Sequence, residues 1–322
     1  MDTKWLVSMW SDFTGIDLIG DVHGCASLLI RLLERLGYTQ DRDGVWSHPE
    51  RRVLFLGDLL DRGPEIVETI DLARRMVSAG HAEMILGNHE ISALNAFFMR
   101  GEVRIPRIHK ETIEQYSSHH ELWRETLKWL LERPLCIVNE HFRAVHACWP
   151  DSLAKRFLEA HPNGRIDRGM LIRSNDPQSL SHQLFNILTR GPQLRLPEHR
   201  SMLSRDGTVR RTFRTSFWHK NPEFYQDVVF QPDPLPDDIA ERPLDEDARR
   251  RLVYYGEDEP PLFFGHYWRE GTPSLIRPNL VCLDYSGVKG GSLVAYRFDG
   301  EKTLDNAKLV WVDADESRAP QD

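Results

Sequence analysis

Three glycine-containing motifs, each directly after a short apolar run, decide the fold of this chain. They read Gly-Asp-Val-His-Gly at residues 20–24, Gly-Asp-Leu-Leu-Asp-Arg-Gly at 57–63 and Gly-Asn-His-Glu at 87–90. The runs before them, at 16–19, 53–56 and 84–86, are typical of buried strands, and helical stretches at 27–36 and 65–79 lie between them. This repetition predicts βαβ units, in which ligands bind at the carboxyl ends of the strands.

The motifs would bring metal-binding and acid–base side chains to one edge of the sheet. The expected members are Asp21, His23, Asp58, Asp61, Arg62, Asn88 and His89. Carboxylates, imidazoles and an amide oxygen bind hard or borderline divalent ions, and the lack of cysteine in the set disfavours a structural zinc cage. Each motif alone would also fit a helix cap, but three in order, each after a strand, favour a functional site.

The motifs resemble those of the calcineurin-like metallophosphoesterases, in the branch of phosphoprotein phosphatases and symmetrical diadenosine tetraphosphate hydrolases. Two later histidines at the ends of apolar runs fit the last metal ligands of that family: His146 in Ala-Val-His-Ala (144–147) and His266 in Phe-Phe-Gly-His (263–266). The resemblance covers residues 16–150 and about 260–300. It implies an α/β (α+β) fold with a central β-sandwich flanked by helices.

Residue by residue, the resemblance implies two divalent metal ions, with manganese expected first and iron or zinc as alternatives. The implied ligands are Asp21 and His23 for one ion, Asn88, His146 and His266 for the other, and Asp58 for both. A hydroxide shared by the ions would attack phosphorus in line. Arg62 and Asn88 would contact the phosphate, and His89, oriented by Asp61, would be the general acid.

The substrate is less well determined than the reaction. Phosphoprotein phosphatases of this family have arginine before Gly-Asn-His-Glu and glycines after the fourth-strand histidine, where this chain has Leu86 and Ala147. The leading expectation is a serine/threonine-phosphatase-like phosphoesterase acting on proteins or small metabolites. The alternative is a dinucleoside polyphosphate hydrolase, because Leu86 and the aromatic pair after His266 look more like the symmetrical diadenosine tetraphosphate hydrolases. A catalytically silent phosphate-binding module is the third interpretation.

Residues 1–150 and 259–322 are expected to form the catalytic domain, with 151–258 as an inserted cap or specificity segment. This segment has proline-rich loops, an acidic second half and a basic first half. The basic residues are Arg190, Arg195, Arg200, Arg205, Arg210, Arg211 and Arg214. They would either lie on solvated surfaces that pair with the acidic half, or bind additional phosphates of the substrate. Trp218 is expected to pack in the apolar interior, and Asp284 to shape the end of a sheet rather than bind metal.

Composition limits the compartment and the partners. The 322 residues carry a formal net charge of -8, which argues against stable nucleic-acid binding. Four scattered cysteines, among them Cys25 beside the first motif, indicate free thiols and a reducing compartment. Residues 1–14 contain two tryptophans but no long apolar core, so neither a signal peptide nor a membrane span is expected. We expect a cytoplasmic protein whose partner is a phosphorylated small molecule, dinucleotide or phosphoprotein.

Overall fold

The computed structural model describes residues 14–100, 106–203, 209–230 and 235–314. The tryptophans near the N-terminus, Arg205 and residues 231–234 of the proline-rich loop lie outside these ranges.

A six-stranded mixed sheet contains the first three predicted strands. It is formed by β1 (Gly15–Ile19), β4 (Arg51–Phe55), β5 (Ala82–Met84), β14 (Asp284–Tyr285), β15 (Ser292–Phe298) and β16 (Leu309–Asp313). β1 pairs with β4 and β4 with β5 in parallel, whereas β15 runs antiparallel to β1. The carboxyl ends of β1, β4 and β5 therefore lie at one edge, as the motifs predict.

A second sheet of four strands packs against the first. Its order is β13 (Leu280–Cys282), β12 (Leu262–Phe264), β7 (Arg143–Val145) and β6 (Cys136–Val138). Alternate residues of both sheets meet in one hydrophobic cluster, among them Leu18, Leu54, Ala144 and Phe263. β6 and β7 pair antiparallel and form the hairpin that precedes His146. The β-sandwich is thus the centre of the molecule.

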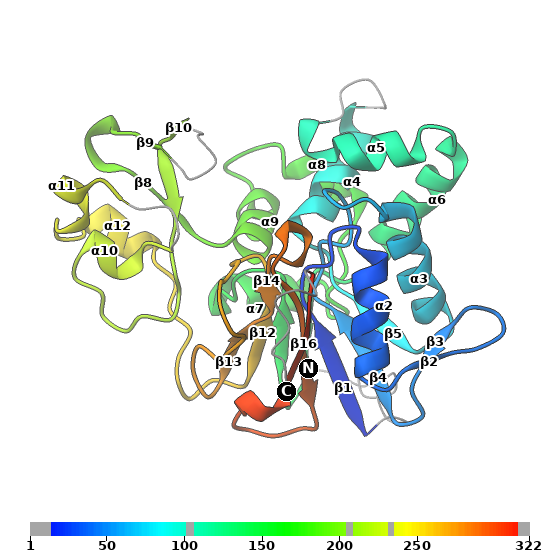
Figure 1. Cartoon of the computed structure of the whole chain (residues 1–322). Coiled ribbons are helices and arrows are strands. Elements are labelled where there is room, and N and C mark those ends of the chain that lie inside the picture. The colour runs from blue at the N-terminus through cyan, green and yellow to red at the C-terminus, as the bar shows by residue number, and fades with distance from the viewer. Residues whose placement is uncertain (1–13, 101–105, 204–208, 231–234, 315–322) are drawn as a thin grey trace.

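Helices cover the outer faces of the sandwich (Figure 1). They are α2 (Ala26–Arg35), α3 (Ile66–Ser78), α4 (Asn88–Arg100), α5 (Lys110–Tyr116), α6 (His120–Leu131), α7 (Asp151–Ala160), α8 (Arg168–Arg173) and α9 (Leu180–Arg190). α2 shows why they form: its leucines repeat at helical spacing, and Leu28, Leu29, Leu32 and Leu33 are all buried in the largest hydrophobic cluster. A small hairpin, β2 (Thr39–Gln40) and β3 (Trp46–Ser47), joins α2 to β4.

The segment from 109 to 131 has apolar residues at helical spacing but forms two helices rather than one. α5 ends at Tyr116 and α6 begins at His120, with Ser117 and Ser118 between them. Serine competes for backbone hydrogen bonds and favours helix ends, and here the Ser117 hydroxyl donates to the Glu114 carbonyl. The break turns α5 back over the loop that follows β4.

Residues 193–203, 209–230 and 235–252 form a lobe beside the sandwich (Figure 1). Its elements are β8 (Gln193–Arg195), β9 (Met202–Leu203), β10 (Val209–Arg210), β11 (Thr212–Arg214), α10 (Tyr225–Val228), α11 (Asp237–Ala240) and α12 (Glu246–Arg251). The lobe has its own hydrophobic cluster, which includes Leu194, Phe213 and Ile239. The helices α7 and α9, by contrast, contribute Phe157 and Leu184 to the cluster of the main body. The expected boundaries at 150 and 259 stay a prediction.

Among the residues that the structure describes, every helix is too short or too polar to span a bilayer.

Candidate metal centre

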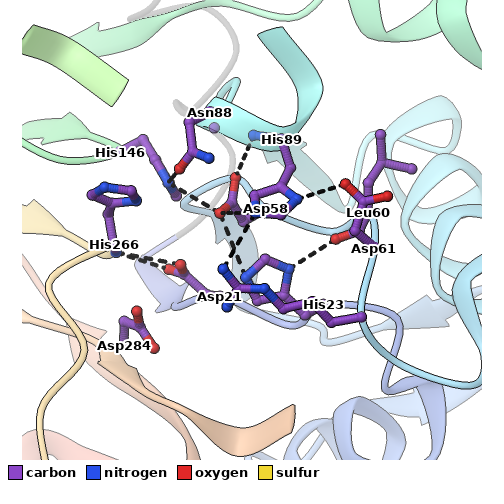
Figure 2. A network of polar contacts seen from close by, with 12 residues as sticks. Asp21, His23, Asp58, Leu60, Asp61, Asn88, His89, His146, His266 and Asp284 are labelled. Atoms are coloured by element: carbon purple, nitrogen blue, oxygen red, sulfur yellow. Dashed lines mark hydrogen bonds and ion pairs between the residues drawn. The ribbon is translucent and has the colours of Figure 1, made fainter. Parts of the chain in front are cut away.

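Five loops meet at the carboxyl ends of parallel strands in the two sheets. Asp21 and His23 follow β1, Asp58 follows β4, and the residues of the third motif follow β5. His146 follows β7 and His266 follows β12, and these two strands are parallel neighbours in the second sheet. Figure 2 shows the side chains of all five loops pointing toward one another around Asp58. The structure therefore brings together every residue that was expected to bind metal.

Asp58 lies at the centre of the group. Its Oδ2 lies 3.5 Å from Nε2 of His23 and 3.4 Å from Nε2 of His146. The ligand atoms of Asp58, His146 and His266 all lie within 4.8 Å of one another, and a second such trio joins Asp58 to His23 and His89. Oδ1 of Asn88 lies 3.3 Å from Nε2 of His146. One carboxylate thus belongs to two groups of side chains that could each hold an ion.

Hydrogen bonds aim the histidines at this centre. The Nδ1 atoms of His23 and His146 lie 2.8 Å and 2.7 Å from the carbonyl oxygens of Leu60 and Leu56. If Nδ1 donates the proton there, the lone pair of Nε2 faces Asp58, which is the tautomer a metal ligand needs. Nε2 of His266 is buried without a hydrogen-bond partner among the described residues. An unpaired buried acceptor is costly, so the donor set fits a bound cation.

The backbone at the site is held in unusual conformations. His23, Asp58 and His266 have φ angles of 47°, 52° and 62°, in the left-handed region that non-glycine residues rarely adopt. A Cβ on Gly87 would lie 2.2 Å from Oδ1 of Asp58, and a Cβ on Gly265 would lie 2.0 Å from Oδ1 of Asp21. The motif glycines are therefore required by close packing against the carboxylates, and such strain is common at functional sites.

The carboxylates make the centre attractive to positive charge. Burial alone would lower the pKa of His146, but Asp58 and Asp21 outweigh it and raise this pKa to about 10. Burial lowers the pKa of His23 to about 3, although Asp58 opposes the shift, so this imidazole is neutral and free to bind an ion. Burial and then the charge of Asp284 raise the pKa of Asp21. The raised pKa values of His146 and Asp21 reflect the negative charge gathered at the centre, as expected where cations bind.

Asp284 lies in this acidic cluster as well as at the end of the sheet. It is buried in β14 and lines the same cavity as Asp21, Asp58 and His266. Its expected role in shaping the sheet end is compatible with β14, but its charge also acts directly on Asp21.

Glu90 supports the loop of Asp58 and was not assigned a role from the sequence. The side chain is fully buried, and its two oxygens accept hydrogen bonds from four backbone N–H groups. The donors are the N–H groups of Asp58 at 2.8 Å, Gly87 at 2.9 Å, Leu59 at 3.0 Å and Leu60 at 3.2 Å. Glu90, the last residue of the third motif, thus fixes the loop that contains the second motif.

His89 and Asp61 form the expected pair, and two further residues complete it. Nδ1 of His89 lies 2.5 Å from Oδ2 of Asp61, which also accepts from Nδ1 of His109 at 2.7 Å. The Thr112 hydroxyl donates to the other oxygen of Asp61. Burial raises the pKa of Asp61, but the hydrogen bonds from His109 and His89 outweigh it and hold this pKa at about 2. His109 and Thr112 come from the segment around α5, where local sequence gave no sign of them.

A cavity of about 450 Å³ opens from the centre toward the lobe. Cationic and aromatic side chains line it beside the proposed ligands: Arg62, Arg210, Arg214, Lys289, Phe230 and Trp268. Nη2 of Arg62 lies 3.4 Å from Nε2 of His89. The cavity therefore presents positive charge next to the group that would hold metal.

The arginines of the middle segment make different contacts, and the expectation that some of them bind substrate phosphates stays a prediction. Arg200 forms a surface ion pair with Asp238 at 2.8 Å, which is the pairing of the basic and acidic halves. Arg214 instead donates to the backbone carbonyl of His266 at 2.9 Å. Burial lowers the pKa of Arg190, although the charge of Asp58 opposes the shift. Trp218 packs with its ring 5.5 Å from that of Tyr267, which confirms its apolar role.

The centre has histidines, carboxylates and an amide around a shared aspartate, and a cationic cavity lies next to it. This is the arrangement of a metal-dependent phosphoesterase. The model of the calcineurin-like phosphoesterase family matches residues 15–266, and the chain belongs to that family. The family is dinuclear and metal-dependent, and the fold is its mixed α/β fold. Membership of a phosphoesterase family is what the sequence led us to expect.

Two kinds of relative are similar to this chain. A bis(5'-nucleosyl)-tetraphosphatase PrpE [asymmetrical] of Halalkalibacterium halodurans is 49% identical over 106 residues, but the match spans 33% of this chain and 42% of the relative. A symmetrical bis(5'-nucleosyl)-tetraphosphatase of Methylobacillus flagellatus is 27% identical over 286 residues, 88% of this chain and 92% of the relative. The match to the symmetrical enzyme thus spans nearly the whole length of both proteins.

Solved structures share the fold. A cold-active protein-tyrosine phosphatase of a Shewanella species covers 91% of this chain and 81% of its own, with a TM-score of 0.53 at 17% identity. A protein serine/threonine phosphatase of Saccharomyces cerevisiae covers 98% of this chain and 83% of its own, with a TM-score of 0.51 at 16% identity. At this level of identity the likeness concerns the fold alone.

Proposed function

We propose that this protein hydrolyses dinucleoside polyphosphates at a centre of two divalent metal ions. The observation that carries the proposal is the convergence of His146 and His266 on Asp58, from strands far apart in the sequence, beside a cavity lined by cations. This substrate class was the alternative from the sequence. It now comes first because the relatives that match along most of the chain are named bis(5'-nucleosyl)-tetraphosphatases.

The proposed ligands divide around Asp58. Asp21 and His23 lie on one side of it for one ion, and Asn88, His146 and His266 lie on the other side for the second. When bound, a pair of divalent ions lowers the pKa of a water molecule and neutralises charge on phosphate oxygens. Nitrogen and oxygen donors admit manganese, iron or zinc, and we propose manganese first.

Arg62 is the proposed phosphate contact. It lies at the mouth of the centre, lines the cavity with Asp58 and His266, and has its guanidinium near His89. A guanidinium can donate two parallel hydrogen bonds to phosphate oxygens, which both orients the group and offsets its charge. Asn88 is the second proposed phosphate contact, through its amide.

His89 is the proposed general acid. Asp61 holds Nδ1 of the ring, so that Nε2 points to Arg62 and to Asp58, from which it lies 3.4 Å and 3.8 Å. A leaving oxygen bound beside Arg62 would therefore meet this nitrogen. Because His109 and Thr112 also bind Asp61, the carboxylate cannot turn away, and the ring keeps its direction through the reaction.

The charge of the cavity favours a substrate with several phosphates. Four cationic side chains of the described residues line it, which is more than a single phosphate monoester can engage at once. The aromatic rings of Phe230 and Trp268 in the same wall offer faces on which a nucleobase can stack. A phosphoprotein substrate would leave part of this lining without a partner.

Free thiols support the proposed cytoplasmic location. None of the four cysteines forms a disulfide, and three of them are buried. Cys25 is partly buried, and burial together with Glu65 raises its pKa to about 11, so the group stays a thiol of low reactivity. We propose a phosphorylated small molecule as the partner, without stable binding of nucleic acid or membrane.

A substrate panel tests the proposal. Manganese-loaded protein would be assayed on p-nitrophenyl phosphate, a phosphothreonine peptide and diadenosine tetraphosphate. We expect kcat/KM to be highest for diadenosine tetraphosphate, with two equal nucleotide products if the cleavage is symmetrical. Preference for the phosphopeptide would instead restore the phosphatase alternative. Metal-loaded protein that turns over none of the three would contradict the proposed centre.

A further inference from the structure

A second cavity, of about 970 Å³, lies where the lobe joins the main body. Its walls are formed by α7 and α9 of the body and by β8 and α12 of the lobe, and its lining includes Arg156, Leu180, Arg195, Arg250, Arg251 and Leu252. We call it the junction groove. Gln193 and Thr212 line both this groove and the cavity at the metal centre, so the two cavities are neighbours along the β8–β11 ribbon.

The junction groove carries positive charge without acidic residues in its lining. Among the residues that the structure describes, four arginines line it and no aspartate or glutamate does. Arg250 and Arg251 pair with carboxylates one turn earlier in α12. Arg156 and Arg195 have no ion pair within the part of the chain that the structure describes. A concave surface with this charge distribution attracts an anion.

The groove also has an apolar wall. Leu153, Leu180, Ile187 and Leu252 lie among the arginines, and the Leu180 side chain is 36% exposed. An inorganic polyphosphate has no surface to place against leucine and isoleucine. A nucleotide has both parts: a base for the apolar wall and phosphates for the guanidinium groups.

A polar face of the β8–β11 ribbon connects this groove to the metal centre. Gln193 pairs with Arg214 and Arg195 with Thr212 across the ribbon, and all four share one face because side chains alternate along a strand. The residues between them belong to the core of the lobe. Arg214, at one end of this face, donates to the His266 carbonyl, and Arg195, at the other end, lines the junction groove.

We propose that the junction groove binds the distal nucleoside phosphate of the substrate while the reacting phosphate lies at the metal centre. Arg156 and Arg195 hold the distal phosphates, and the apolar wall holds the base. The inference rests on the proposed function, because a dinucleoside polyphosphate has a second nucleotide to place there and a simple phosphate ester has none. The ribbon face then carries the phosphate chain between the two sites.

A double substitution, R156Q/R195Q, tests the groove by comparing substrates. Both side chains are exposed, so their replacement is not expected to affect folding. We expect KM for diadenosine tetraphosphate to rise by about tenfold, with kcat nearly unchanged, and both constants for p-nitrophenyl phosphate to stay at the wild-type values. The matched control is R242Q, because Arg242 forms an exposed ion pair with Glu198 and lines neither cavity. Equal loss on both substrates, or unchanged KM for the dinucleotide, would overturn the proposal.

A direct binding measurement separates this inference from the proposed function. Calorimetry would follow ADP binding to metal-loaded protein in an excess of orthophosphate, which occupies the metal centre. We expect wild-type protein and R242Q to bind ADP alike and R156Q/R195Q to bind it about tenfold more weakly. If ADP binding depends on the two arginines in this way but the wild-type protein does not hydrolyse diadenosine tetraphosphate, the proposed substrate is rejected and the groove remains a nucleotide site. ADP binding that does not depend on the two arginines would reject the groove.

Discussion

Replacing Glu90 by glutamine is expected to destabilise the loop of Asp58 while leaving every proposed metal ligand in place. The wild-type carboxylate accepts four backbone hydrogen bonds, two on each oxygen, from the loops that follow β4 and β5. Glutamine has the same shape but only one acceptor oxygen. Its NH₂ group must face two of the four N–H donors, in a site that excludes water.

The size of the effect follows from these lost bonds. Each buried donor left without a partner costs about 1–3 kcal/mol, so two of them predict a loss of about 2–6 kcal/mol in the free energy of unfolding. Asp58 moves with the loop, so the affinity for both metal ions should fall as well. Neither effect requires any change in the side chains that touch substrate.

Urea unfolding of metal-free protein measures the first effect, and metal titration measures the second. The matched control is Glu114→Gln, because Glu114 is exposed and lies 3.8 Å from Lys110 in a surface pair, where we expect a change below about 0.5 kcal/mol. If Glu90→Gln unfolds at the same urea concentration as wild type, with the same m value, the four hydrogen bonds do not hold the loop and the reasoning fails.

Three further perturbations address the centre and the fold. His89→Ala should keep both ions by metal analysis yet lower kcat on an alkyl phosphate by about 10²–10⁴-fold, and an undiminished kcat would remove His89 from the mechanism. Asp17→Ala should cost about 1.5–3 kcal/mol of stability, because the buried Arg51 guanidinium loses its hydrogen bond at 3.0 Å to Asp17 but keeps Asp299 as a partner. Asp71→Ala, in an exposed pair, should cost below about 1 kcal/mol, and equal urea midpoints for the two variants would contradict this. Chelation with EDTA should abolish hydrolysis and lower Tm, and added manganese should restore both; a chelator-resistant activity would argue against a metal centre.

The sequence predicted the site wherever a ligand follows an apolar strand directly. The positions of Asp21, Asp58 and Asn88 follow from three parallel strands whose ends share an edge, and His146 follows from the hairpin before it. In these cases the chemistry and the element that positions it are adjacent in the chain. A pattern of a few residues is then enough to place a side chain in space.

Other parts of the site depend on packing between distant segments, and the sequence did not show them. His109 and Thr112 reach Asp61 because the chain turns at Ser117 and lays α5 over the preceding loop. The direction of Arg214 likewise depends on how the ribbon β8–β11 lies against His266. No local periodicity carries such information. The middle segment could therefore be described as basic, but its inward-facing arginines could not be chosen.

Anomalous diffraction from manganese-soaked crystals tests the central claim most directly. The account predicts two manganese peaks on opposite sides of the Asp58 carboxylate, one within bonding distance of His23 and the other within bonding distance of both His146 and His266. A single peak away from Asp58 would contradict it. So would a structure in which manganese fully occupies other sites while His146 and His266 bind no ion.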